Sequence, residues 1–368
     1  MTAASLTSRL PASGDELSIT VTGEPRTIYD WSEDRCEDEF IPDSPARAFR
    51  RADGQIALIA THRKNWMMVG DTFQSLKPVC HTIFDSSRIK NTEGLFWIQA
   101  TYTRDGTHVV ALVSNDQRNL VIEQGCDASE ADDACWLNKI ANARSTNMGE
   151  SFALEQGPNR YVAQVANSYP DNASHRYGMF TTSNIFEHNK KFYFLSWGQG
   201  EGKMDPGNCL FRSDDPLDVE GWRGWDGEHF RIDMRLGKGV CRPITGLPAP
   251  VRSVSYLAFK GIWIATYPAR LALNSEKTGV PAFYYSTSRD LIKWTPPERI
   301  TRAPLKPREL NDDEVWAFPS IIDTSSGSHN FDTIDDPTTA ILTYTKHHLR
   351  NGVGTMRRDL VYLPLRIQ

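Results

Sequence analysis

Three carboxylates stand just before apolar segments, where they could carry out acid–base chemistry. Asp43 precedes "SPARAF", Glu93 precedes "GLFWI" and Glu314 precedes "VWAF". Two carboxylates from different segments can face each other across a pocket, one protonating a leaving oxygen and the other activating water. Glycoside hydrolysis with inversion uses such a pair at a separation of about 6.5–9.5 Å. Because the acid needs a raised pKa, we expect burial or a like charge beside it.

Each of these carboxylates also has a purely structural interpretation. Asp43 lies between two prolines in "PDSP" and could simply form a turn. Glu93 could be a solvated residue at the start of a strand, and Glu314 belongs to the charged run "NDDEVW", which is typical of solvent-exposed surface. The catalytic hypothesis therefore depends on which of them point into a common pocket.

Polar and aromatic side chains near apolar segments are candidates for substrate binding. Arginine binds carboxylates through two parallel hydrogen bonds, so it would suit an acidic sugar. Tryptophan offers a flat face to the C–H side of a sugar ring, and Trp316 lies two residues from Glu314. The predicted substrate-binding residues are Arg47, His62, Arg63, Asn184, Arg252 and Trp316.

The sequence predicts neither a metal site nor a cofactor. His347 and His348 are neighbours in an apolar run, and adjacent residues of a strand point to opposite faces, so they do not ligate one zinc ion together. No GxSxG, HExxH or phosphate-binding glycine loop occurs.

The segments that would position these residues have the chemistry of β-strands. Short runs such as "QIALIATH", "HVVALVSN", "KFYFLSWG" and "LVYLPLRI" are rich in β-branched and aromatic residues. Turns such as "RADGQ" and "TRDGT" separate them. Helical periodicity is almost missing, so we expect an all-β fold with far less helix than the third that is typical of globular domains.

A repeated turn indicates how the strands are organised. The segments "STNMGESF", "RSDDPLDVEGW" and "STSRDLIKW" each begin with small hydroxyl residues or Asp and end on an aromatic residue. Ser, Thr and Asp side chains accept hydrogen bonds from nearby backbone N–H groups and so stabilise tight turns. We expect each turn at the outer edge of one sheet, with its aromatic ring packed between sheets.

Five hairpins share a common plan, which predicts a five-bladed β-propeller formed by residues 1–368 as a single domain. The N-terminal "LSITVTGE" and the C-terminal "LVYLPLRI" are expected to share a blade and close the ring, which would leave no exposed sheet edge. The alternatives are a six-bladed propeller and a double sandwich. "STNMGESF" is close to the Asp-box of sialidases, with Asn147 in the place of Asp.

Composition limits the partners and the cellular location. The formal net charge is −5 without a basic block, which argues against nucleic acid, and no apolar run is long enough to span a membrane. The first residues lack the apolar core of a signal peptide, as a processed chain would also. Among the six cysteines, Cys126 and Cys135 lie close enough in sequence to form a disulfide, so we expect a secreted or periplasmic protein. The alternative is a cytoplasmic protein with free thiols.

The segments "PDSPARAF", "EGLFWI" and "STSRDLIKW" resemble those of the five-bladed propeller glycosidases, which include arabinanases, β-xylosidases and invertases. "NCLFRSDDPLDVEGW" is similar to uncharacterised bacterial propeller proteins. The resemblance implies a general base at Asp43 and a general acid at Glu93. The chain departs from the family pattern because Glu93 belongs to the second hairpin rather than the third, and the third carboxylate has no clear counterpart.

These observations predict a glycoside hydrolase that cleaves a plant or microbial glycan, with furanose units as one option. Its partner would be an oligosaccharide or polysaccharide. The alternatives are a non-catalytic propeller that binds glycan or protein, and a sialidase-like hydrolase with an arginine cluster. A deep central pocket with two or more carboxylates would favour the enzyme.

Overall fold

The computed structural model describes residues 17–86, 94–127, 134–165, 168–170, 175–200, 204–274, 276–306 and 313–368. Its secondary structure is 47% strand and 5% helix, so the all-β prediction is confirmed. The described helices are α1 (Trp31–Asp34) and α2 (Arg118–Glu123), with short 3-10 turns at η3 (Gly157–Asn159) and η4 (Val219–Gly221).

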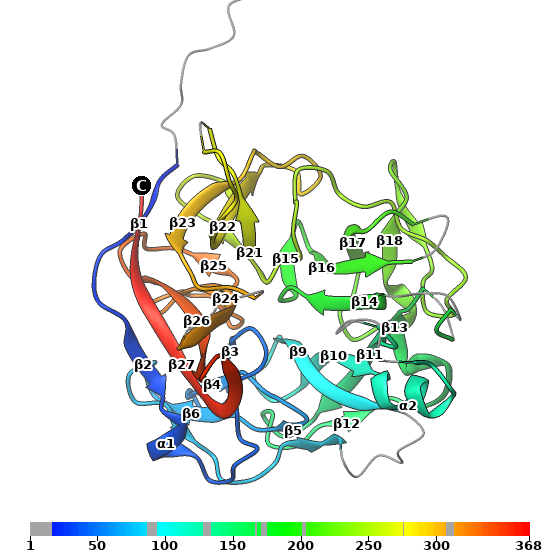
Figure 1. The fold of residues 1–368 in the computed structure, drawn as a ribbon, viewed down its shortest axis with the longest axis horizontal. Coiled ribbons are helices and arrows are strands. Elements are labelled where there is room, and N and C mark those ends of the chain that lie inside the picture. The colour runs from blue at the N-terminus through cyan, green and yellow to red at the C-terminus, as the bar shows by residue number, and fades with distance from the viewer. Residues whose placement is uncertain are drawn as a thin grey trace, which may run out of the picture.

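The strands form antiparallel sets that follow one another around a common centre (Figure 1). The first set contains β3 (Arg47–Arg50), β4 (Ile56–Ile59), β6 (Met68–Gly70) and β7 (Lys77–Pro78), beside the pair β5 (Lys64–Asn65) and β8 (Phe84–Asp85). The second contains β9 (Leu95–Thr103), β10 (Val109–Asp116), β11 (Leu137–Ser145), β12 (Ala153–Leu154) and β13 (Tyr161–Ala163).

The third set contains β14 (Tyr177–Thr182), β15 (Phe186–His188), β16 (Lys191–Gln199), β17 (Gly207–Ser213), β18 (Arg223–Trp225) and β19 (Phe230–Ile232). The fourth contains β20 (Ser253–Leu257), β21 (Ile262–Leu271), β22 (Val280–Ser288), β23 (Glu298–Arg302) and the short parallel strand β25 (Thr333–Ile334). The fifth contains β24 (Glu314–Asp323), β26 (Ala340–Arg350), β27 (Val353–Ile367), β1 (Ile19–Val21) and β2 (Arg26–Tyr29).

The second and third sets join into one sheet of eleven strands, whereas the sequence predicted a separate blade for each hairpin. The junction is a short parallel pairing of β11 with β14, in which Asn138 lies opposite Gly178. Gly178 has a φ of +110°, and a Cβ atom there would lie 2.0 Å from the carbonyl oxygen of Asn138. Glycine therefore permits a backbone approach that any other residue would block.

The two ends of the chain meet in the fifth set, as the sequence predicted. Strand β1 pairs antiparallel with β27, with Ile19 opposite Ile367. Strand β2 pairs with an earlier part of the same strand, where Arg26 lies opposite Tyr362. The last strand of the chain is thus held between β26 and the N-terminal strands.

The repeated turns follow β11, β17 and β22. Each of these is the third strand of its set when strands are counted outward in hydrogen-bonded order from β9, β14 or β20, so the predicted position at the outer part of a sheet is confirmed. After β22, the Ser288 hydroxyl accepts from the backbone N–H of Leu291 (2.9 Å), and Asp290 accepts from the N–H groups of Ile292 and Lys293. The hydroxyls of Ser145 and Ser213 accept equivalent bonds after β11 and β17. The closing rings of Phe152, Trp222 and Trp294 are all buried.

One buried arginine binds the innermost strands of all five sets. Arg47, at the start of β3, is 4% exposed. Its guanidinium donates to the carbonyl oxygens of Ala46, Gln99 (β9), Thr182 (β14) and Arg252 (just before β20), and to the hydroxyl of Ser320 (β24), over 2.6–3.3 Å. A single planar side chain thereby satisfies acceptors that five separate segments direct toward the centre.

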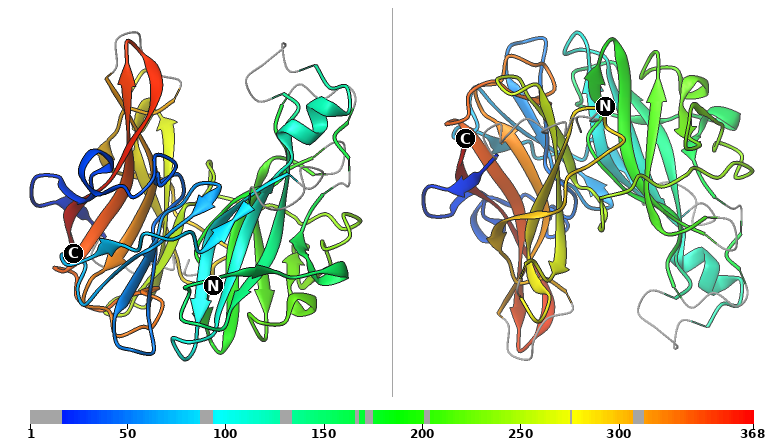
Figure 2. Two further views of the ribbon diagram at one scale, coloured as in Figure 1. Left: turned by 90° about the horizontal axis from the view of Figure 1, so that it is seen from below. Right: turned by 90° about the horizontal axis from the view of Figure 1, so that it is seen from above.

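Three disulfides join Cys36 to Cys80, Cys126 to Cys135 and Cys209 to Cys241. The predicted bridge between Cys126 and Cys135 is confirmed, with a Cα separation of 5.8 Å. No helix in the described ranges has the length and apolar character needed to cross a membrane. On one side of the molecule, the long β26–β27 hairpin and the region of α2 both extend beyond the sheets (Figure 2).

Candidate active site

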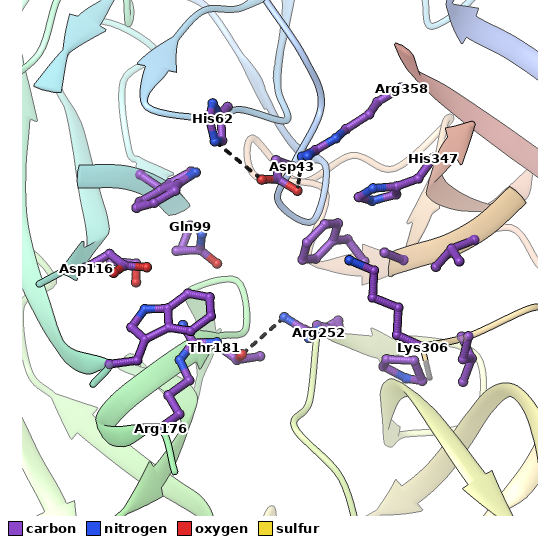
Figure 3. A pocket seen from close by; sticks show the side chains of 18 of the residues that line it. Asp43, His62, Gln99, Asp116, Arg176, Thr181, Arg252, Lys306, His347 and Arg358 are labelled. Carbon is purple, nitrogen blue, oxygen red and sulfur yellow. Dashed lines mark hydrogen bonds and ion pairs between the residues drawn. The ribbon is translucent and has the colours of Figure 1, made fainter. Parts of the chain in front are cut away.

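A cavity of about 660 Å³ is lined by residues of the innermost strands, of the β26–β27 hairpin and of α2. Side chains from all five sets line it, and Figure 3 shows many of them pointing inward. Its charged lining residues are Asp43, Asp116, Arg118, Arg176, Arg252, Arg270, Lys306 and Arg358.

Asp43 is one of the two carboxylates among the described residues that line the cavity. The prolines on either side restrict the loop, and the neighbouring Ser44 hydroxyl accepts from the backbone N–H of Thr61 at 2.8 Å, which ties the loop to the end of β4. The Asp43 carboxylate forms an ion pair with Arg358 of β27 at 2.5 Å and lies 3.7 Å from Nε2 of His62 (Figure 3). The loop before β3 and the last hairpin thus fix its position together.

Asp116, the second carboxylate, ends β10. In the β9–β10 hairpin it lies opposite Leu95, so the end of the second strand returns to the start of the first. The side chain is buried, and its carboxylate accepts from the backbone N–H of Arg118 at 3.2 Å. Burial raises the pKa of Asp116, and the charge of nearby Arg176 opposes this only in part. Its environment therefore favours the protonated acid that can donate a proton.

Two histidines with lowered pKa values flank Asp43. Burial lowers the pKa of His62, although the Asp43 carboxylate acts in the opposite direction. Burial also lowers the pKa of His347 to about 4. Both rings are therefore neutral at neutral pH, and Nδ1 of His62 and Nε2 of His347 have no hydrogen-bond partner within the described residues. Both rings line the cavity as uncharged polar groups.

Arg252 lies on the side of the cavity formed by the third, fourth and fifth sets. Its Nη1 donates to the hydroxyl of Thr181 at 3.1 Å, and its guanidinium carbon lies 5.1 Å from the ring centre of Phe318. Thr181 and Phe318 both have a φ of +58°, and each coincides with a register shift in its strand. Such bulges redirect side chains and are frequent next to functional sites.

Three tryptophans provide aromatic faces in the cavity lining, namely Trp97, Trp136 and Trp316. Trp97 meets the His62 ring edge-on at 5.4 Å, and Trp136 lies 4.4 Å from the guanidinium of Arg176. Trp316 stacks on Tyr344 at 4.4 Å, so one face rests against the protein. Together with the neutral histidines, these rings suit the apolar faces and hydroxyls of a sugar.

The structure brings some of the predicted site residues together and separates others. Asp43, His62, Arg252 and Trp316 line the cavity. Arg47 does not line it, and its guanidinium is bonded to protein oxygens. Asn184 exchanges two hydrogen bonds of 2.8 Å with the backbone of Val254 and does not line the cavity.

The remaining predicted residues do not line the cavity or lie outside the described ranges. Arg63 forms a two-pronged ion pair with Glu39 away from the lining. Glu314 accepts from the indole N–H of Trp316 at 2.7 Å and pairs with Lys346, so it supports the cavity wall without lining it. Glu93 lies outside the described residues.

Sequence reasoning missed Asp116, Thr181, His347 and Arg358. The sequence points to residues at the starts of the hairpins, whereas Asp116 stands at the end of "VVALVSND". In the antiparallel hairpin this end lies beside the start of β9, so Asp116 reaches the same cavity. Strand β14 spans Tyr177–Thr182, so the third set brings Thr181 to the cavity rather than the predicted Asn184. His347 and His348 do separate as predicted, since His348 pairs with Asp359 at 2.5 Å.

No protein-family model matches this chain, and no curated protein matches it. Among solved structures, the chain is similar to an endo-arabinase from Bacteroides thetaiotaomicron VPI-5482, with a TM-score of 0.50 and 13% identity over 93% of this chain and 98% of that one. It is also similar to the catalytic domain of a GH62 α-L-arabinofuranosidase from Coprinopsis cinerea, with a TM-score of 0.48 and 11% identity over 95% and 96% of the two chains. A thermostable family-43 glycoside hydrolase gives a TM-score of 0.48 and 11% identity over 89% and 96%.

The chain shares the fold of the endo-arabinase. The resemblance to propeller glycosidases that the sequence indicated is thereby confirmed at the level of the fold. At 13% identity the likeness does not extend to substrate or catalytic residues, so the function must be argued from the cavity itself.

Proposed function

We propose that this protein is a glycoside hydrolase whose active site is the central cavity. The observation that carries the proposal is the pair of carboxylates, Asp43 and Asp116, which reach one cavity from different sheets in different environments. Asp43 is held by an arginine, whereas Asp116 is buried with a raised pKa. A carboxylate pair with different environments is what acid–base cleavage of a glycosidic bond requires.

The roles follow from these environments. Asp116 donates its proton to the leaving oxygen, because its raised pKa keeps that proton available. Asp43 accepts a proton from the attacking water, in keeping with the base that the family resemblance implies for this position. The neutral rings of His62 and His347 and the tryptophan faces orient the sugar. The substrate is an oligosaccharide or polysaccharide.

The proposed fold is a five-bladed propeller of residues 1–368, with the ring closed where β27 pairs with β1 and β2. The contacts of Arg47 with five innermost segments support five blades around one axis. Export from the cytoplasm is proposed as well. Three disulfides among six cysteines support it, since such bridges persist mainly in oxidising compartments.

The test begins with a hydrolysis screen on arabinan, xylan, fructan and sialosides, followed by Asp43→Asn and Asp116→Asn on any substrate that is cleaved. Both variants should lower kcat about 10²–10⁴-fold, because each removes one proton transfer while keeping the side-chain shape. Asp116→Asn should be far less damaging with a nitrophenyl leaving group, which departs without a proton.

The matched control is Asp214→Asn, since the Asp214 side chain is 79% exposed in the turn after β17. It should keep native turnover. Near-native activity of Asp43→Asn would show that Asp43 is not the base. Binding of several glycans in the cavity without cleavage of any of them would replace the enzyme by a glycan-binding module.

A further inference from the structure

The cavity has a charge opposite to that of the whole chain. The chain carries a net charge of −5. Among the described lining residues, six are arginine or lysine and two are aspartate, which leaves an excess of four positive charges. A concave surface of one sign concentrates ligands of the opposite sign, and a neutral glycan would gain nothing from this excess.

Two other arginines near the cavity have their guanidinium groups bound by protein acceptors. Arg358 pairs with Asp43, and Arg47 donates to four carbonyl oxygens and a hydroxyl. Arg252 differs from both. Its guanidinium has a single side-chain hydrogen bond, to the Thr181 hydroxyl, and within the described residues its Nε has no partner and no carboxylate lies within ion-pair distance.

The surroundings of Arg252 make this isolation costly. Burial and the positive charge of nearby Arg176 together lower the pKa of Arg252 to about 9, and the Asp43 carboxylate, which is paired with Arg358, opposes this only in part. A buried cation without a counter-charge is unfavourable, so proteins usually pair it. Figure 3 shows Arg252 and Arg176 on the same side of the cavity as Thr181. The missing counter-charge is therefore expected from a ligand.

The backbone around Arg252 indicates that its position is built in. The residues that contact it from two different strands, Thr181 and Phe318, both have positive φ angles at strand bulges. This conformation is unfavourable for threonine in particular, because its side chain is β-branched. Strain of this kind persists where the surrounding structure enforces it, and it is concentrated at ligand-binding and catalytic positions.

We propose that the cavity binds an acidic saccharide, and that Arg252 and the Thr181 hydroxyl, with Arg176 beside them, bind its anionic group. The group is an oxyanion attached to the sugar, either the carboxylate of a uronic acid or a sulfate ester. The guanidinium of Arg252 lines the cavity and offers its Nη atoms to the anion, and the Thr181 hydroxyl, which accepts from Arg252, donates its own proton to the anion. This inference builds on the proposed function, because it names the substrate class of the same cavity.

The first experiment measures anion binding without turnover. Thermal denaturation and calorimetric titration are carried out at constant ionic strength with D-glucuronate, D-glucose, sulfate and inorganic phosphate as probes. Native protein should be stabilised saturably by D-glucuronate or by sulfate, and not by D-glucose. A larger effect of D-glucuronate assigns the site to a uronic acid, and a larger effect of sulfate assigns it to a sulfate ester.

The variants decide whether Arg252 is responsible. Arg252→Gln should lower the affinity for the anion about 10–100-fold, in line with the loss of charge-assisted hydrogen bonds. Arg252→Lys keeps the charge and should restore part of the affinity. Arg366→Gln, which changes an exposed arginine of β27, is the matched control and should bind as the native protein does. A native melting temperature for Arg252→Gln without ligand excludes misfolding as the cause.

Several outcomes would overturn the inference. These are a lack of saturable stabilisation by both D-glucuronate and sulfate, an equal response of the Arg252→Gln variant, or stabilisation by phosphate alone. Failure of the inference is distinguishable from failure of the proposed function. Cleavage of a neutral glycan that depends on Asp43, without any anion effect, removes the inference only. Anion binding that depends on Arg252, without hydrolysis of any glycan, removes the proposed enzyme only.

Discussion

Replacing Arg47 by methionine should destabilise the fold without directly removing a ligand contact. The arginine donates five hydrogen bonds to segments that belong to five different strand sets. Methionine has a similar length but no donor, so four carbonyl oxygens and the Ser320 hydroxyl lose the bonds that Arg47 supplies. The cross-connections at the centre would then depend on side-chain packing alone.

The magnitude follows from two opposing contributions. An acceptor left without a partner in the interior costs about 1–3 kcal/mol. Against this, removing the cation also removes its own desolvation, which lowers the pKa of Arg47 to about 9. Water can also enter the space that the guanidinium leaves. We therefore expect a net loss of about 3 kcal/mol, which is less than the sum of five separate bonds. For 368 residues this corresponds to a fall in Tm of about 4 °C.

The assay is thermal and urea-induced unfolding of native protein, Arg47→Met, Arg47→Lys and the surface control Arg366→Met. The lysine variant keeps the charge and offers three donors that do not form a planar fork, so its Tm should lie between those of the native protein and Arg47→Met. The hypothesis that Arg47 binds substrate makes a different prediction, namely a native Tm with weaker ligand affinity. A Tm of Arg47→Met equal to that of the native protein would refute the structural role.

Two further predictions concern pH and the disulfides. The pKa of His347 is lowered to about 4 in the folded protein, against about 6.5 in the unfolded chain. Between these two values the unfolded chain binds one more proton than the folded protein. The free energy of unfolding should therefore fall by about 2 kcal/mol from pH 7 to pH 5. His347→Gln should reduce the pH dependence by this amount in urea unfolding at the two pH values, while the buried His62 keeps its own contribution. The exposed His229→Gln should leave the pH dependence unchanged. A native pH dependence in His347→Gln would contradict the argument. The three disulfides span sequence separations of 44, 32 and 9 residues. On loop-closure entropy alone, the free energy of unfolding should fall by about 4 kcal/mol in the Cys36→Ser/Cys80→Ser double variant and by less than about 3 kcal/mol in the Cys126→Ser/Cys135→Ser double variant. The reverse order in denaturant unfolding would show that the loop argument does not hold here.

The repetitive features of this fold were predictable from the sequence because their determinants are local. The turn after Ser288 depends on a hydroxyl, an aspartate and a closing tryptophan within seven residues, and each bond that it forms is visible in the motif. Alternating β-branched and aromatic residues predicted the strands for the same reason. The pairing of β1 with β27 also followed, since two apolar segments at the chain ends had no other partner in the repeat.

The side chains at the centre were harder to predict because their roles depend on contacts between distant segments. Arg47 and Arg252 are both arginines next to apolar strands, and nothing local distinguishes them. In the structure, Arg47 is surrounded by carbonyl oxygens and Arg252 faces the cavity. The bulges at Thr181 and Phe318 also escaped prediction, since a positive φ at a threonine or phenylalanine leaves no trace in a hydrophobic pattern.

The position of Asp116 shows how the topology of a hairpin can replace a missing motif. The sequence predicts a buried acid with a raised pKa, but it points only to residues at the starts of innermost strands. In an antiparallel hairpin, the last residue of the second strand lies beside the first residue of the first, as Asp116 lies beside Leu95. Each hairpin therefore directs two positions toward the cavity. Asp116 ends an apolar strand and is 7% exposed, and that burial is what raises its pKa.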